Sequence, residues 1–103
     1  MIDTIKKQVK SGNYRYTTHG FERCAEREIS PNETEDVILS GEIIESYTDD
    51  KYGPTCLIYG KTEKGRILHV HCSIDPAWII TAYDPTLNPE EWEADYKRMR
   101  KKE

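Results

Sequence analysis

Four short strand candidates in the second half of the chain constrain the fold more than any other feature. They lie near residues 42–48, 55–60, 66–73 and 78–83. Short segments rich in Gly, Pro and Asp separate them, as is typical of turns. Connections this short join antiparallel strands, because parallel strands need a long crossover. The sequence therefore predicts a four-stranded antiparallel sheet.

Helical patterns precede these strands. Apolar residues at helical spacing predict short helices near residues 2–9 and 19–28. A further helix begins at Ser30, where Pro31 occupies the first helical position and Glu33 completes a capping box. Three helices are thus expected before the sheet.

A closing helix is expected after the last strand. Asn88 is a suitable N-cap, and the two glutamates after Pro89 favour the positive end of a helix dipole. Residues 97–102 hold five basic side chains, which favour its negative end. Together with the sheet, this order predicts a single α+β domain spanning residues 1–103.

Composition excludes several classes of protein. The longest continuous apolar run is far shorter than the roughly 20 residues that cross a bilayer. The charged N-terminus lacks the apolar stretch of a signal peptide, so we expect a cytoplasmic protein with no membrane partner. Three widely spaced cysteines without a Cys-x-x-Cys motif are expected to be reduced thiols.

A polar stripe follows the predicted helix over residues 19–28. His19, Arg23 and Arg27 recur every four residues, which places them on one side of a helix. Two guanidinium groups suit phosphate, because each planar fork donates parallel hydrogen bonds to its oxygens. A histidine exchanges protons near neutral pH. The alternative is that this stripe has no functional role and is a solvated helix face whose arginines pair with neighbouring glutamates.

A second polar stripe lies on the last two predicted strands. His69 and His71 alternate with apolar residues and so share one strand face. Thr81 and Tyr83 show the same alternation on the next strand. His-x-His is also a weak metal signal, and His19 is the candidate third ligand of such a site. The alternative to both functional interpretations is that the two histidines are exposed and have no function.

These residues resemble a known family. The run THGFERCAEREIS at residues 18–30 resembles the "H…R…eRgIs" signature of domain of unknown function 4258, and LHVH at 68–71 and IITAY at 79–83 resemble its later segments. The resemblance implies a fold and function near the RelE/ParE/BrnT toxins of toxin–antitoxin pairs. It also implies cleavage of messenger RNA without a metal, and a partner antitoxin, often a zinc-finger protein.

The sequence and the resemblance lead to one functional hypothesis with two alternatives. We expect a metal-independent endoribonuclease that acts on RNA, free or on the ribosome, with no cofactor. His19 with His69 or His71 would supply the base and the acid. Arg23 and Arg27 would stabilise the phosphate charge, and Tyr83 would position the phosphate or donate a proton. The alternatives are a non-catalytic module that binds a protein or an anion, and a metal protein using His19, His69 and His71.

The net charge of -4 weighs against broad adhesion to RNA. The acidic surplus lies in residues 31–60, which hold one basic and seven acidic side chains. Residues 1–30, which contain the first stripe, hold six basic and four acidic side chains. Local phosphate binding therefore remains compatible with the charge.

Overall fold

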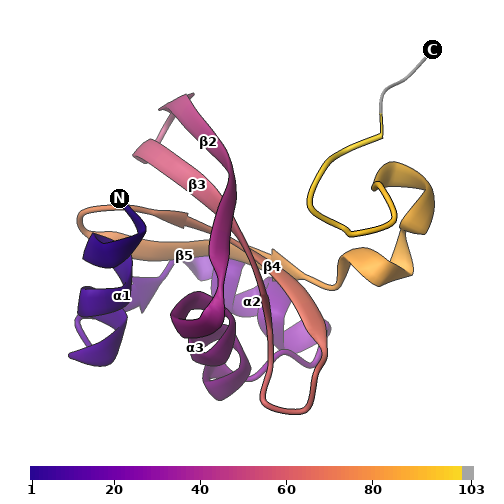
Figure 1. The fold of residues 1–103 in the computed structure, drawn as a ribbon. Coiled ribbons are helices and arrows are strands. Elements are labelled where there is room, and N and C mark those ends of the chain that lie inside the picture. Colours follow the sequence, from indigo (N-terminus) through magenta and orange to yellow (C-terminus); the bar gives the residue numbers. More distant parts are fainter. Residues whose placement is uncertain (101–103) are drawn as a thin grey trace.

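The computed structural model describes residues 1–100, and at positions 49 and 50 it describes the backbone alone. The helices and strands are α1 (Ile2–Lys10), β1 (Tyr14–Tyr16), α2 (Thr18–Glu26), α3 (Pro31–Ser40), β2 (Glu42–Asp50), β3 (Gly53–Lys61), β4 (Ile67–Ser73) and β5 (Ala77–Tyr83). Two short 3₁₀ turns follow, η1 (Pro85–Leu87) and η2 (Pro89–Glu91). Figure 1 shows the helices gathered on one side of the strands, with the C-terminal segment away from them.

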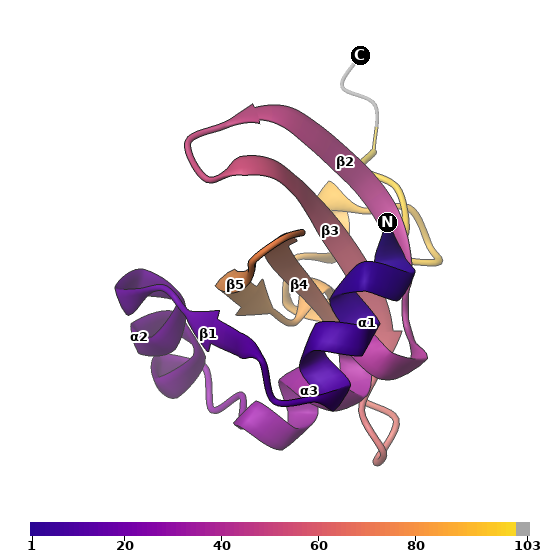
Figure 2. The same ribbon diagram turned by 90° about the vertical axis from the view of Figure 1, so that its left-hand side faces the viewer.

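The sheet has five strands in the order β1-β5-β4-β3-β2. Strands β2 to β5 form the predicted antiparallel meander, and the long β2–β3 hairpin curls away from the rest (Figure 2). The prediction of a purely antiparallel four-stranded sheet is wrong, because β1 adds a fifth strand that runs parallel to β5, with Tyr14 opposite Ala77. A three-residue strand is too short for alternation to reveal, and α2 begins almost directly after it.

The predicted closing helix is also wrong. After η2 the chain becomes extended at Trp92, which pairs with Met99 in an isolated antiparallel bridge, and Tyr96 has a left-handed φ of 58°. Trp92 is 4% exposed, and burying its indole on the sheet stabilises the extended segment. A short helix in solvent would be marginally stable and would not gain this burial. Lys97 anchors the segment through an ion pair of 3.1 Å with Glu42 of β2. The basic residues at positions 101 and 102 lie outside the described residues.

One face of the sheet and the helices enclose the core. Val70 of β4 lies opposite Ile58 of β3 and Ala82 of β5, so their side chains point to the helices. The same core contains Ile5, Val9, Cys24, Ile29, Val37, Ile38, Cys56, Leu68, Cys72 and Ile79. Among residues 1–100, no helix is long and apolar enough to span a membrane.

The opposite face of the sheet carries the predicted polar stripe. His69 lies opposite Tyr83, and His71 lies opposite Thr81, so these four side chains share one face. A register shift between His71 and Cys72 leaves one additional residue in β5. The predicted grouping of His69, His71, Thr81 and Tyr83 on one face is confirmed, but strict alternation along β5 is interrupted at this shift, since Ile79 lies in the core.

Helix α2 lies along the free edge of β5, beyond the point where β1 ends. The backbone N–H of Thr17 donates to the Ile79 carbonyl at 3.0 Å, and Arg27 at the other end of α2 donates to the Ala82 carbonyl at 2.7 Å. Gly20 permits this approach, since a Cβ there would lie 2.3 Å from the Ile79 carbonyl oxygen. The small residue at position 20 therefore fixes where Arg27 reaches the sheet.

Replacing Gly20 with alanine is expected to lower the free energy of unfolding by about 3 kcal/mol, because the clash is with backbone that has no rotamer to change. Helix propensity alone predicts the opposite sign, a gain of about 1 kcal/mol. Urea denaturation measures the difference, with Glu22→Ala on the exposed side of α2 as the control. A Gly20→Ala protein as stable as the parent would contradict the close packing of α2 on β5.

Candidate active site

His69 of β4 is buried completely and both of its ring nitrogens have partners. Nε2 lies 2.6 Å from the carbonyl oxygen of Tyr96, and Nδ1 lies 3.2 Å from the hydroxyl oxygen of Tyr83. A carbonyl only accepts hydrogen bonds, so in the neutral ring Nε2 carries the proton. Nδ1 is then the acceptor, and the Tyr83 hydroxyl donates to it.

The protonation states of this pair follow from their surroundings. Burial lowers the pKa of His69 and outweighs the opposing effect of the Tyr96 carbonyl, so the ring is neutral at pH 7. Burial raises the pKa of Tyr83 to about 12, and the carboxylates of Glu45 and Glu91 add to the effect. A neutral imidazole therefore accepts a hydrogen bond from a protonated phenol.

Trp92 closes the other side of His69. The two rings meet edge to face, with their centroids 4.4 Å apart, and the Tyr83 ring lies 5.3 Å from His69 in a similar arrangement. Edge-to-face contacts are favourable for aromatic rings. Tyr83 is half-buried where His69 is fully enclosed, so a ligand would reach the pair at the Tyr83 hydroxyl.

Arg27 reaches the same face from the end of α2. Its Nη1 atom donates to the Thr81 hydroxyl at 3.2 Å and to the Ala82 carbonyl at 2.7 Å. The guanidinium group therefore lies over the end of β5, at Thr81 and Ala82 and next to Tyr83. Because Arg27 is otherwise exposed, donors of its planar fork remain available to a ligand.

A pocket of about 500 Å³ connects these groups. It is hollowed between the end of α2, the end of β5 and the C-terminal segment. Its walls are formed by Glu26, Arg27, Arg66, Tyr83, Asp84, Leu87, Asn88, Glu91 and Trp92. The pocket thus combines two guanidinium groups with a phenol that is bonded to a buried histidine.

Arg66 is a pocket residue that sequence reasoning missed. It forms ion pairs with Glu33 at 3.4 Å and with Asp84 at 3.5 Å. It also donates to the backbone carbonyls of Arg27 and Glu28, at the end of α2. With these bonds Arg66 holds the end of α2 against the sheet. It precedes β4 in a turn, and no motif distinguishes it there.

The other two members of the helix stripe lie outside this pocket. The side chain of His19 is 79% exposed and its Nδ1 is 3.9 Å from the Glu22 carboxylate. Arg23 is half exposed and pairs with Glu26 at 3.3 Å. Of the three stripe residues, the hydrogen bonds described for residues 1–100 connect Arg27 alone to the sheet.

His71 lies two residues from His69 on the same face. Its Nε2 is 2.9 Å from the Thr55 hydroxyl, and its ring meets Tyr47 edge to face at 5.4 Å between centroids. It is partly exposed and lies opposite Thr81, the residue that Arg27 contacts. The structure therefore brings Arg27, His69, His71 and Tyr83 to one face, while His19 and Arg23 stand on the outer side of α2.

The bonds of His69 also bear on the metal alternative. Nε2 donates its proton to the Tyr96 carbonyl, and the lone pair of Nδ1 accepts from the Tyr83 hydroxyl, so neither nitrogen is free for a cation. Within residues 1–100, no three or more His, Cys, Asp or Glu side chains are grouped as metal ligands. The geometry favours proton transfer at His69 over metal coordination.

The buried neutral state of His69 predicts a pH dependence of stability. The unfolded chain takes up a proton below about pH 6.5, whereas the folded chain resists it because its His69 pKa is lower. The free energy of unfolding should therefore fall as pH drops through this range, by at most about 1.4 kcal/mol per pH unit from this residue. Urea denaturation across pH should show a shallower fall for His69→Gln than for the parent. An unchanged profile in His69→Gln would contradict a neutral buried His69, and the exposed His19→Gln is the matched control.

The α+β fold thus holds a buried histidine bonded to a tyrosine, beside a pocket lined by two arginines. These residues define a candidate acid–base site. The profile of the family described as domain of unknown function (DUF4258) matches residues 16–84 of the chain. The chain belongs to this family. The match extends from the end of β1 to the residue after β5, so it includes α2, Arg66 and all six predicted site residues. No curated protein and no solved structure gives a significant match.

Proposed function

We propose that this chain is a metal-independent endoribonuclease, related to the RelE/ParE/BrnT toxins and paired with an antitoxin. One observation carries the proposal: the Tyr83 hydroxyl, bonded to a buried neutral His69, lines a pocket together with Arg27. Cleavage of RNA at its 2′-hydroxyl needs a base, an acid and cationic stabilisation of phosphate. These residue types supply all three without a cofactor.

His69 and Tyr83 would act together as the base. The Tyr83 oxygen accepts the proton of the RNA 2′-hydroxyl while its own proton moves to Nδ1 of His69. The 2′-oxygen then forms its bond to phosphorus. The Tyr96 carbonyl, 2.6 Å from Nε2, stabilises the resulting imidazolium. Because burial keeps His69 neutral at pH 7, Nδ1 is ready to accept this proton.

Arg27 and His71 would complete the reaction. The Arg27 guanidinium stabilises the charge that develops on the phosphate oxygens as the 2′-oxygen attacks. His71, opposite the Thr81 that Arg27 contacts, donates a proton to the departing 5′-oxygen. The products are a 2′,3′-cyclic phosphate and a free 5′-hydroxyl. His19 and Arg23, exposed on the outer side of α2, would contact the RNA backbone beyond the reacting phosphate.

The partner and location of the protein follow from the same proposal. A toxin of this kind acts in the cytoplasm on free or ribosome-bound messenger RNA and is held inactive by a cognate antitoxin, often a small zinc-finger protein. Residues 31–60 carry a surplus of acidic side chains. A basic segment of the partner would therefore meet charge of the opposite sign there.

Induced expression in bacteria tests the proposal. The parent chain should arrest growth, and Arg27→Gln and His71→Ala should relieve the arrest while accumulating to the same level as the parent. Ser40→Ala on α3, remote from the pocket in sequence and fold, is the control and should stay toxic. Equal toxicity of the parent and of both folded variants would remove Arg27 and His71 from the proposed reaction.

A further inference from the structure

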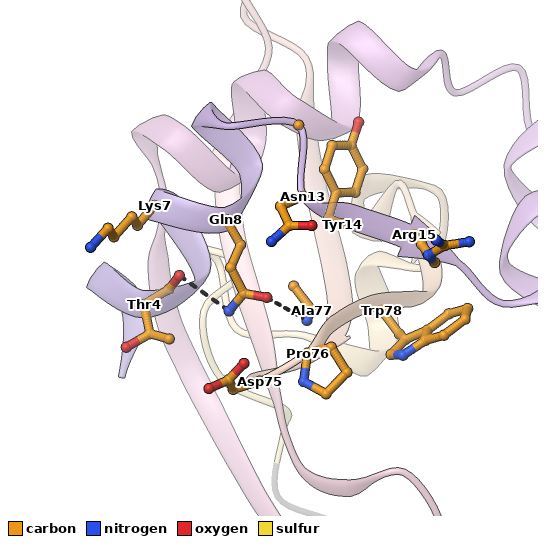
Figure 3. A pocket seen from close by; sticks show the side chains of 11 residues that line it. Thr4, Lys7, Gln8, Asn13, Tyr14, Arg15, Asp75, Pro76, Ala77 and Trp78 are labelled. Atoms are coloured by element: carbon orange, nitrogen blue, oxygen red, sulfur yellow. Dashed lines mark hydrogen bonds between the residues drawn. The ribbon is translucent and has the colours of Figure 1, made fainter.

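A second hollow lies at the other end of β5, outside the candidate active site. Its volume is about 600 Å³, and it is formed by α1, the start of β1 and the turn between β4 and β5. Figure 3 shows Lys7 and Thr4 on one side and Arg15 and Trp78 side by side on the other. None of its lining residues lines the pocket of the candidate active site.

The floor of the hollow is fixed by Gln8. Its side-chain amide donates to the Ile74 carbonyl at 2.7 Å and accepts from the Ala77 N–H at 2.8 Å, which fastens α1 to the β4–β5 turn. The second of these bonds is drawn in Figure 3. Because both the nitrogen and the oxygen of the Gln8 amide are hydrogen-bonded to the turn, the floor of the hollow is preorganised. Preorganisation lowers the entropic cost of binding a ligand.

The rim of the hollow is cationic and aromatic. Neither Lys7 nor Arg15 forms an ion pair within residues 1–100, whereas Arg23, Arg66 and Lys97 all do. Asp75 is the one carboxylate among the lining residues. Trp78 is partly exposed, unlike the buried Trp92. Unpaired cations beside an exposed indole are typical of sites that stack a base and hold its phosphate.

The register of the sheet connects this hollow to the candidate active site. Arg15 lies opposite Trp78 in the parallel β1–β5 pair, so both side chains point to the same face. Trp78 alternates with the buried Ile79 and thus faces the side that carries Thr81 and Tyr83. Tyr83 lies five positions after Trp78 in β5, a distance on the order of 17 Å. A short single strand would span that distance along the open face.

We infer that this hollow binds one nucleotide of a single-stranded RNA, and that a phosphate a few nucleotides further along the same strand lies at Tyr83 and Arg27. The base stacks on Trp78, and Arg15 beside it holds its phosphate. The Asn13 side chain, which Figure 3 shows turned into the hollow, offers an amide donor and acceptor to the base edge. The inference rests on the proposed function for the identity of the strand, and RNA binding can be measured apart from cleavage.

Equilibrium binding of a labelled 2′-O-methyl RNA of about ten nucleotides tests the inference, because this RNA lacks the attacking hydroxyl. Trp78→Leu should weaken binding about 5- to 100-fold, and Trp78→Phe, which keeps an aromatic face, should restore most of it. Arg15→Gln should lower the slope of log K against log salt by about 0.7. Arg15 is exposed, so its variant is expected to fold even if Trp78→Leu does not. Lys64→Gln, in the β3–β4 turn, is the control.

The outcomes separate the two proposals. Binding that depends on Trp78 and Arg15 in a protein that never cleaves unmodified RNA supports the nucleotide site and overturns the ribonuclease. Cleavage by the parent, with Trp78→Phe, Trp78→Leu and Arg15→Gln all binding as the parent does, overturns the nucleotide site and leaves the ribonuclease standing. A parent that neither binds nor cleaves RNA overturns both.

Discussion

Replacing Tyr83 with phenylalanine is expected to lower kcat/KM for RNA cleavage by about 10²- to 10⁴-fold, the usual contribution of general acid–base catalysis. The substitution removes one oxygen atom and keeps the ring that packs on His69 and Trp92. Nδ1 of His69 then has no hydroxyl through which to receive the substrate proton. Initial rates on a fluorogenic oligoribonucleotide, with thermal unfolding of the same samples, measure the effect.

Tyr59→Phe is the matched control for this prediction. Tyr59 lies on β3 opposite His69, and its ring is 6.1 Å from the imidazole, so it shares the face but not the proton path. Its variant should cleave RNA at the rate of the parent. Equal rates for Tyr83→Phe and Tyr59→Phe would exclude the Tyr83 hydroxyl from the reaction.

Arg27→Gln is expected to lower kcat by about 10²- to 10³-fold, because the site loses the cation that stabilises the developing phosphate charge. Arg27→Lys restores the charge without the planar fork and should recover part of the rate. Arg23→Gln, on the same helix and paired with Glu26, should cost less than about tenfold, since an exposed ion pair contributes little. Arg23→Gln impaired as severely as Arg27→Gln would indicate that the outer side of α2, not the pocket, holds the phosphate.

Much of the fold follows from local sequence signals. Ser30, Pro31 and Glu33 form the expected capping box, with both of its reciprocal hydrogen bonds. The four predicted strands correspond to β2–β5, because alternation and short turns act over a few residues. Such signals are strong where the burial of one strand face repeats over several residues.

The two errors share a physical cause. The strand β1 is stabilised by pairing with β5, which lies more than 60 residues further along the chain. The segment after Asn88 has a good helix-start sequence, yet contact between Trp92 and His69 determines its conformation. Interactions between distant segments leave no local period and override local propensity.

The site was predictable in part for the same reason. Alternation placed His69, His71, Thr81 and Tyr83 on one face, and helical spacing selected Arg27. Sequence spacing does not reveal that His69 is fully buried, nor that a backbone carbonyl of Tyr96 fixes its tautomer. Arg66 contributes through contacts that exist only in the folded chain.

The most direct test of the proposed reaction is incubation of the purified chain with a single-stranded RNA in the presence of EDTA, followed by analysis of the new RNA ends. The proposed mechanism predicts cleavage that EDTA does not inhibit, with 2′,3′-cyclic phosphate and 5′-hydroxyl termini, and cleavage slower by at least about 10²-fold with Tyr83→Phe at the same protein concentration. Intact RNA after incubation with the folded parent, or termini of another chemistry, would contradict it.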